Sequence, residues 1–212
     1  MNLVLLGLPG SGKGTLAASL SSALDTPHIS TGDIFRQAMV DGTELGNRIR
    51  KGMDEGRFVD DETTLAIVAE RLSRPDCATG FILDGFPRTL AQAKAFTALL
   101  GSRQRTLDAV LLLDASDAAV TERLLSRRQC RKCGLIFGLD RRPWDEGVCD
   151  NCGGELYVRG DDNPESVTRR LRTYHKETAP VVDYYHRLGV LRMVASQGTA
   201  AETLAVAKTA IA

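Results

Sequence analysis

The segment GLPGSGKGT, at residues 7–15, has the residue types and the spacing of a phosphate-binding loop. Glycines allow backbone N–H groups to turn inward and form a nest for an anion. Lys13 adds a mobile positive charge, and a helix that starts here would direct its positive N-terminal end at the same anion. The residues predicted to contact phosphate are Gly10, Ser11, Gly12, Lys13, Gly14 and Thr15.

Gly14 departs from the general pattern of such loops, in which Ser or Thr follows the lysine directly. Here Thr15 comes one position later. A glycine-rich turn without a ligand is the alternative interpretation. The apolar run before the loop, the lysine and the helical pattern after it agree better with a phosphate site.

Four of the five cysteines form two close pairs, Cys130-x2-Cys133 and Cys149-x2-Cys152. Each pair presents two thiolates, and two such pairs complete a tetrahedron of sulfur ligands around zinc. Because four sulfurs leave no open coordination position, we expect a structural Zn²⁺ that stiffens a segment with little core of its own. The remaining Cys77 is predicted to be a half-buried thiol.

Two alternatives exist for the cysteine pairs. Disulfides would need an oxidising compartment, whereas an odd number of cysteines with two CxxC pairs favours metal ligation in a reducing cytoplasm. The other alternative is a zinc ribbon that binds nucleic acid, because several neighbours are basic: Arg131, Lys132, Arg141 and Arg142.

Arg123 and Arg127 are four residues apart in a stretch with a helical pattern, so both are expected on one helical face. Like charges at that spacing repel unless an anion lies between or above them. From the residues alone, a solvated basic face is the simpler interpretation, and an anion site is the alternative.

The glycine-rich loop, the cysteines and the arginines must be positioned by secondary structure. The sequence contains short apolar segments, typical of strands, separated by amphipathic stretches of helical length. The predicted strands are residues 3–6, 28–30, 81–83, 110–113 and 190–194. Strands that alternate with helices imply an α/β fold, a parallel sheet with helices on both faces. Ligands of such sheets bind at the carboxyl ends of the strands.

Helix-start signals support this alternation. An amphipathic helix is predicted to begin at Asp61. Asn163 followed by Pro164 has the order of an N-cap and a first helical residue. Thr199 and Glu202 have the spacing of a capping box.

Two stretches interrupt the alternation. Residues 31–59 are predicted to form two short helices joined at Gly42, without a strand, and residues 128–159 contain the paired cysteines. Both are expected to be insertions that close over the edge of the sheet as lids.

The composition narrows the class of protein. The chain of 212 residues is long enough for one α/β domain with one or two small inserted modules. Its 27 basic residues balance its 27 acidic residues, which argues against a non-specific nucleic-acid binder. No apolar run approaches the roughly 20 residues of a membrane span, and the first residues lack the basic start of a signal peptide.

Three motifs together, GLPGSGKGT at 7–15, STGDIFR at 30–36 and LDGFPRT at 83–89, resemble the nucleoside monophosphate kinases. The closest match is the bacterial type of adenylate kinase with a long, metal-binding lid. The resemblance implies a P-loop NTPase core with a five-stranded parallel sheet, made of residues 1–29, 60–127 and 160–212. It also implies an inserted helical AMP-binding domain at 30–59 and a zinc-binding lid at 128–159.

The resemblance implies roles for individual residues. Arginine suits the acceptor phosphate because its fork matches phosphate and stays charged. The implied AMP-binding residues are Thr31, Arg36, Arg57, Phe58, Val59, Gly85, Arg88, Gln92, Arg159 and Arg170. The implied ATP-binding residues are Gly10, Ser11, Gly12, Lys13, Gly14, Thr15, Arg123, Arg127, Ile136, Phe137 and Ala200. The catalytic group would be Lys13, Asp84, Arg88, Arg127, Arg159 and Arg170, with Asp84 associated with Mg²⁺.

The resemblance therefore predicts a cytoplasmic, monomeric adenylate kinase that converts ATP and AMP reversibly into two ADP. It predicts Mg²⁺ with ATP and a structural Zn²⁺, and neither a nucleic acid nor a membrane as partner. Thr31 favours AMP, because kinases for UMP and CMP tend to carry a different small residue there. Another nucleoside monophosphate kinase is the first alternative, and a nucleotide-gated zinc-ribbon protein that binds nucleic acid is the second.

Overall fold

The computed structural model describes residues 1–139, 141–196 and 198–211. Its elements follow one another in the order β1 (Asn2–Gly7), α1 (Lys13–Leu24), β2 (His28–Ser30), α2 (Thr31–Val40), α3 (Glu44–Asp54), α4 (Asp61–Arg71), η1 (Pro75–Cys77), β3 (Phe81–Asp84), α5 (Leu90–Ser102), β4 (Ala109–Asp114), α6 (Asp117–Ser126), β5 (Arg128–Cys130), β6 (Ile136–Phe137), β7 (Leu156–Tyr157), α7 (Pro164–Thr173), η2 (Tyr174–Thr178), α8 (Ala179–Arg187), β8 (Leu191–Ala195) and α9 (Ala200–Ile211).

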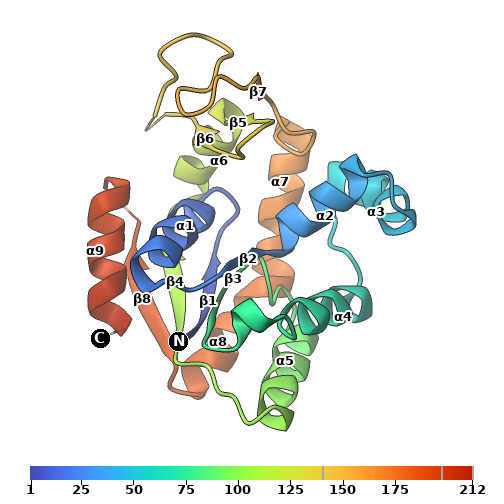
Figure 1. The fold of residues 1–212 in the computed structure, drawn as a ribbon, viewed down its shortest axis with the longest axis vertical. Coiled ribbons are helices and arrows are strands. Elements are labelled where there is room, and N and C mark those ends of the chain that lie inside the picture. The colour runs from blue at the N-terminus through green and yellow to red at the C-terminus, as the bar shows by residue number, and fades with distance from the viewer. Residues whose placement is uncertain (140, 197, 212) are drawn as a thin grey trace.

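A parallel sheet forms the centre of the molecule (Figure 1). Among the described residues it has five strands in the order β2-β3-β1-β4-β8, and every neighbouring pair is parallel. This confirms the predicted α/β fold. The last predicted strand is displaced by one residue, since β8 begins at Leu191, where pairing with β4 places Val110 opposite it.

Alternate residues of the strands supply two separate cores, one on each face of the sheet. In β1, Leu3 and Leu5 pack with α1 and α9, whereas Val4 and Leu6 face the opposite core. That second core contains Phe81, Phe86 and Phe96 together with side chains of α4, α5 and α8. Continuous apolar strands are required here because both faces are covered.

The helix starts follow the predicted signals. The Asn163 side chain accepts from the N–H of Ser166 and caps α7, with Pro164 as its first residue. Thr199 and Glu202 form the reciprocal hydrogen bonds of a capping box before α9. Both predictions are confirmed.

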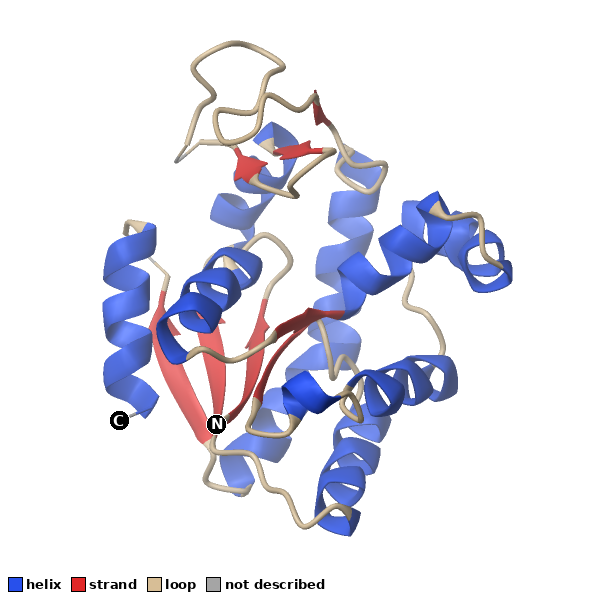
Figure 2. Cartoon of the chain, in the orientation of Figure 1, coloured by secondary structure: helices blue, strands red, loops and turns tan. Residues whose placement is uncertain are grey.

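Two groups of elements project beyond the carboxyl ends of the strands (Figure 2). The first is the pair α2 and α3, joined by a turn at Gly42, as predicted. The second is a small antiparallel sheet of β6, β5 and β7, which the sequence did not predict. In the described part of the chain, no helix has both the length and the apolar character needed to cross a membrane.

Candidate functional site

The loop between β1 and α1 adopts a conformation that only glycine accommodates easily. Gly10 and Gly12 have φ values of 85° and 95°. A Cβ on Gly10 would lie 2.8 Å from the side chain of Leu124 and 3.0 Å from the carbonyl oxygen of Val120. The loop therefore packs tightly on α6, and helix α1 starts directly at Lys13. This is the strand–loop–helix arrangement that a phosphate nest requires.

Lys13 is folded back onto this loop. Its Nζ donates to the carbonyl oxygens of Gly7 and Leu8, at 2.8 Å each. The pKa of Lys13 is lowered to about 8, chiefly by burial; Asp84 opposes this shift, and the positive charges of the nearby arginines contribute to it. The charged form of Lys13 is thus destabilised in this conformation, and a polyanion bound to the loop would stabilise the charged form.

Asp84 ends β3 and faces the phosphate loop, because a Cβ on Gly14 would lie 3.4 Å from its Oδ2. Burial would raise the pKa of Asp84, but His28, Lys13 and Arg88 together hold the pKa of this carboxyl below its usual value. The buried Nε2 of His28 lies 3.9 Å from Asp84 Oδ2. Asp84 is therefore a carboxylate beside the predicted phosphate position, where a Mg²⁺ ligand is chemically suitable.

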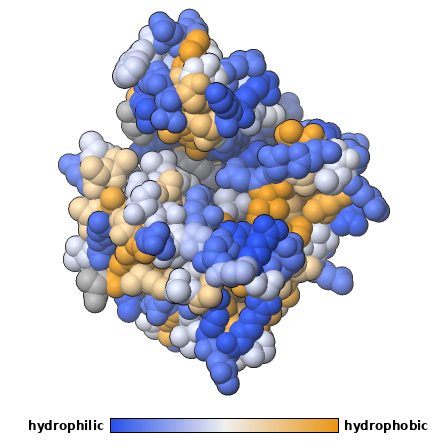
Figure 3. All heavy atoms as spheres, viewed as in Figure 1, coloured by the Kyte–Doolittle hydropathy of each residue, from blue (hydrophilic) through white to orange (hydrophobic). Residues whose placement is uncertain are grey.

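A second pocket lies beside this loop, between α2, α3, α5 and α7. In the space-filling view, a hollow separates the upper lobe, which carries the cysteines, from the body of the molecule (Figure 3). The pocket is lined by Thr31, Phe35, Arg36, Met53, Gly56, Arg57, Phe58, Val59, Thr64, Gly85, Arg88, Gln92, Asp161 and Arg170. The structure thus brings together nine of the ten residues assigned to AMP, all except Arg159.

Arg88 is held from several sides in this pocket. Its main-chain N–H donates to Gln92 Oε1 at 2.7 Å, and its Nε donates to the carbonyl oxygen of Gly85 at 2.7 Å. The Thr178 hydroxyl donates to its carbonyl oxygen at 2.8 Å, and its guanidinium lies over the Phe58 ring. Burial lowers the pKa of Arg88 to about 10, and nearby Arg170 adds to this effect. Arg88 is a fixed, desolvated cation, which suits an anionic ligand.

The prediction for Arg123 and Arg127 was partly wrong. Helix α6 ends at Ser126, and Arg127 has an extended backbone, so the two arginines do not share a helical face. Arg127 instead forms a two-pronged ion pair with the buried Asp162, at 2.7 and 2.6 Å. Arg123 donates to the carbonyl oxygen of Ser196 at 3.4 Å.

Arg159 and Arg170 lie on either side of the acidic pair Asp161-Asp162. Arg170 contacts both carboxylates, at 3.0 and 3.1 Å. Arg159 donates from Nε to Gln129 Oε1 at 2.7 Å. The pKa of Arg159 is lowered to about 10, first by burial and then by the neighbouring cations Arg36 and Arg127. Cations are therefore concentrated between the phosphate loop and the second pocket.

The remaining residues assigned to ATP, Ile136, Phe137 and Ala200, differ from one another in burial. The Phe137 side chain is 1% exposed and packs in the core of the small sheet with Cys130, Cys149 and Leu156. Ile136 is half-buried, and Ala200 is exposed at the start of α9. The sequence did not reveal that Phe137 is needed as core in a segment with few other apolar residues.

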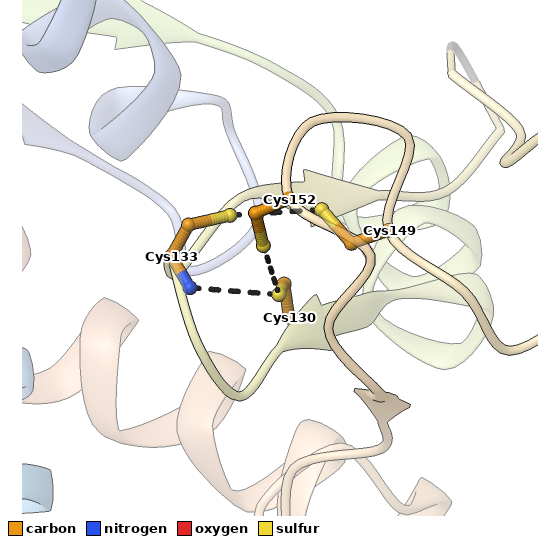
Figure 4. A group of neighbouring side chains, drawn as sticks. All are labelled: Cys130, Cys133, Cys149 and Cys152. Atoms are coloured by element: carbon orange, nitrogen blue, oxygen red, sulfur yellow. Dashed lines mark hydrogen bonds between the residues drawn. The ribbon is translucent and has the colours of Figure 1, made fainter.

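The four paired cysteines converge on one point in the small sheet (Figure 4). Their sulfur atoms all lie within 4.8 Å of one another, and Cys130–Cys152 and Cys133–Cys149 are 3.5 and 3.6 Å apart. Four thiolates about 2.3 Å from a tetrahedral Zn²⁺ would be about 3.8 Å apart. The donor set and its spacing therefore fit zinc, and the sulfurs are not paired as disulfides.

Main-chain N–H groups favour the thiolate form of two of these cysteines, Cys130 and Cys133. The N–H groups of Lys132 and Cys133 point at the Cys130 sulfur, at 3.4 and 3.5 Å. The N–H of Leu135 lowers the pKa of Cys133 to about 6. Gly154 is needed beside them, because a Cβ there would lie 2.9 Å from the Cys130 sulfur. Such N–H···S contacts favour the thiolate form that binds metal.

Cys77 lies away from this cluster and is fully buried, not half-buried as predicted. Its sulfur contacts the Arg71 guanidinium at 3.0 Å, and burial raises its pKa. The thiol is part of the core beneath β3.

Several residues of the site were missed at the level of sequence. Five residues line the second pocket but were not assigned to it: Phe35, Met53, Gly56, Thr64 and Asp161. Phe35 and Gly56 could have been found, since they directly precede the assigned residues Arg36 and Arg57. The others come together only through tertiary packing, for which the sequence contains no local signal.

Comparison with known proteins agrees with this geometry. The family model described as adenylate kinase matches residues 5–190. The adenylate kinase of Caldicellulosiruptor bescii is 48% identical over 204 residues, 96% of this chain and 95% of the relative. That of Archaeoglobus fulgidus is 48% identical over 192 residues, 90% of this chain and 88% of the relative. These relatives do not favour the pyrimidine-kinase or nucleic-acid alternatives.

Proposed function

This chain belongs to the adenylate kinase family, and on that basis we propose which part of the site binds each nucleotide. The enzyme transfers one phosphoryl group reversibly, ATP + AMP = 2 ADP. In our proposal the loop from Gly7 to Thr15 holds the phosphates of ATP, and the second pocket holds AMP. The arginines between them hold the two sets of phosphates together.

The lining of the second pocket supports an acceptor that has one charged end and one flat, apolar end. Arg36, Arg88 and Arg170 supply the cations for a phosphate. Phe35, Met53 and Val59 supply apolar surface for a base, and Gln92 adds a polar amide at that end. A nucleoside monophosphate has this distribution of charge and apolar surface.

No general base is required, because the attacking oxygen belongs to a phosphate that is already anionic. Catalysis then consists of positioning and of stabilising charge on the transferred group. In the proposal Lys13, Arg88, Arg127, Arg159 and Arg170 supply that charge. Mg²⁺ bound with ATP would be associated with Asp84, directly or through water, and would neutralise charge on the phosphates.

Asp161 and Asp162 hold Arg170 and Arg127 close to the phosphate loop. These carboxylates keep like charges together that would otherwise repel one another. We infer that the arginines are pre-positioned, so that nucleotide phosphates need only compete for guanidinium groups already in place.

The zinc-binding segment is proposed to be a structural lid, residues 128–159, and residues 30–59 the AMP-binding domain, both on the core of residues 1–29, 60–127 and 160–212. Closure of the lid would exclude water and protect ATP from hydrolysis.

The observation that carries the proposal is the group of half-buried arginines that lies around an apolar-ended pocket beside the phosphate loop. The test is a panel of AMP, UMP, CMP and GMP with Mg-ATP, followed by measurement of ADP formation. AMP should be the fastest acceptor. Faster turnover of a pyrimidine acceptor would contradict the assignment of the pocket.

Arg88→Met should raise the KM for AMP and lower kcat, because it removes a desolvated cation from the acceptor phosphate. Arg103→Met is the matched control, since Arg103 is an exposed arginine of the same region that donates to the carbonyl oxygen of Ala69. An Arg88 variant with unchanged kinetics would exclude its role.

A further inference from the structure

We propose that Asp61 is a positioning residue that sets the base specificity of the acceptor pocket, by fixing the orientation of the Gln92 side-chain amide. The inference rests on the proposed function, in which the second pocket holds the acceptor nucleotide. Asp61 is not among the residues that line this pocket, so it would act only through Gln92.

The contact between α4 and α5 brings these two residues together. Asp61 Oδ1 accepts from Gln92 Nε2 at 2.8 Å, and Asp61 Oδ2 accepts from the Thr89 hydroxyl at 2.9 Å. Asp60 caps α4, so the carboxylate of Asp61 is available for α5. Thr89 is itself the N-cap of α5 and accepts from the N–H of Gln92.

The amide of Gln92 is therefore held at both ends by groups of fixed polarity. Its oxygen accepts from the main-chain N–H of Arg88 at 2.7 Å, and its nitrogen donates to Asp61. A main-chain N–H can only donate, and carboxylate oxygens only accept. Turning the amide over would place two donors together on one side and two acceptors together on the other, in a residue that is 2% exposed.

This orientation decides which base Gln92 can match. After its two internal contacts, the amide retains one N–H and one acceptor position, and the residue lines the pocket. A 6-aminopurine offers a ring-nitrogen acceptor beside an amino donor, as in AMP. A 6-oxopurine offers an N–H donor beside a carbonyl acceptor, so the pattern is reversed and matching it requires the amide to turn over.

The test compares Asp61→Asn with Asp60→Asn. An asparagine at 61 can present either a donor or an acceptor to Gln92, so one of the two penalties for turning the amide disappears. Asp60→Asn removes the same charge one residue earlier, and Asn keeps the N-cap of α4. The measurement is the ratio of kcat/KM for AMP to kcat/KM for IMP, the 6-oxo analogue.

We expect the AMP-to-IMP ratio of Asp61→Asn to fall about tenfold, the order of effect of removing one unpaired buried polar contact. Asp60→Asn should keep the wild-type ratio. If Asp61→Asn lowers both kcat/KM values equally, Asp61 is merely structural and the inference is wrong. Failure of the wild-type chain to phosphorylate AMP would instead overturn the proposed function.

A measurement on the wild-type chain covers the case in which Asp61→Asn does not fold. With ¹⁵N-labelled glutamine, the Gln92 side-chain amide should show slowly exchanging protons, one shifted by its carboxylate partner, in the AMP complex. Rapidly exchanging amide protons without this shift would show that the amide is not fixed, and would equally overturn the inference.

Discussion

Lys13 occupies the point at which the phosphate loop and the arginine group meet. It is held by two carbonyl oxygens of its own loop and is destabilised as a cation by burial. Lys13→Met should lower kcat about a hundredfold or more, because a preorganised charge at the transferred group contributes on that scale. Steady-state kinetics measures this, and Lys94→Met, on the exposed side of α5, is the control. Near-normal kcat in Lys13→Met would refute the role.

The lowered pKa of Lys13 also predicts a pH dependence. Below pH 8 Lys13 is already charged, but above it the neutral form dominates in the chain without ligand. A bound polyanion favours the charged form, so ATP binding should take up protons and weaken as the pH rises above 8. Calorimetric titrations at pH 8.5 in buffers of different ionisation enthalpy measure this uptake. Lys13→Arg, whose side chain stays charged, should abolish it.

The lowered pKa of Lys13 also makes the free energy of unfolding depend on pH, and this dependence has the opposite sign to that of ATP binding. In the unfolded chain Lys13 has its ordinary pKa near 10.5, so between pH 8 and that value the unfolded state binds more protons. The contribution of Lys13 to the free energy of unfolding therefore rises with pH across this window. The residue costs stability at neutral pH, and that cost is relieved by its ligand.

The ion pair between Arg127 and Asp162 joins the end of α6 to the chain that leaves the small sheet. The Asp162 side chain is fully buried, so Asp162→Ala would leave Arg127 without its partner and should lower the free energy of unfolding by about 3 kcal/mol or more. Asp145→Ala, at an exposed position of the small-sheet segment, should change it little. Urea unfolding of both variants measures the difference, and equal stabilities would contradict the importance of the pair.

At the scale of elements, the sequence was most informative where the physical cause is local. Buried parallel strands need continuous apolar residues, so runs such as those of β1 and β4 were visible directly. Caps such as Asn163 act within three residues and were also visible. The motif residues of the phosphate loop could be assigned because their backbone requirements are local as well.

What could not be predicted depends on contacts between distant residues. Arg127 leaves the helix and pairs with a carboxylate 35 positions later, which its helical spacing from Arg123 did not reveal. Phe137 is core in a segment whose other buried residues are mainly cysteines. Asp61 reaches Gln92 31 positions later, and nothing in either local sequence indicates the pairing.

The small sheet of β5, β6 and β7 has a very small core, made of Cys130, Phe137, Cys149 and Leu156. Its order should therefore depend on metal. Zinc analysis should give one ion per chain, and removal by a chelator should lower the melting temperature. Hydrogen exchange should show residues 128–159 losing protection first. Cys149→Ser should lose zinc, whereas Cys77→Ser should retain it; a metal-free protein of equal stability would disprove the site.

At the scale of the whole molecule, the α2–α3 pair and the small sheet both project beyond the carboxyl ends of the parallel strands (Figure 1). Helix α7, which follows the small sheet in the chain, is hydrogen-bonded to the end of α3: the Ser166 hydroxyl donates to the carbonyl oxygen of Asp54, and Arg169 donates to that of Glu55. Closure over two nucleotides would therefore be a movement of whole elements around a sheet that remains fixed.

This movement can be followed with the one tryptophan of the chain. Trp144 is 86% exposed in the cysteine-bearing segment, and Val40 is 79% exposed at the end of α2. Val40→Cys, labelled with an acceptor dye, should show higher energy transfer from Trp144 when AMP and a non-hydrolysable ATP analogue are both bound. The same label at Val206, on α9, should change less. Unchanged transfer at position 40 would contradict closure.

The chain enters the small sheet through β5 and leaves it through β7, and these two strands are hydrogen-bonded neighbours, with Gln129 opposite Tyr157. The two points at which the small sheet joins the core, β5 and β7, thus lie side by side. Residues can be added or removed between them at little entropic cost, because the ends are already joined. A metal-binding segment of this kind can be lengthened, shortened or exchanged in evolution and in engineering. The parallel sheet, its two cores and the phosphate loop would keep their structure.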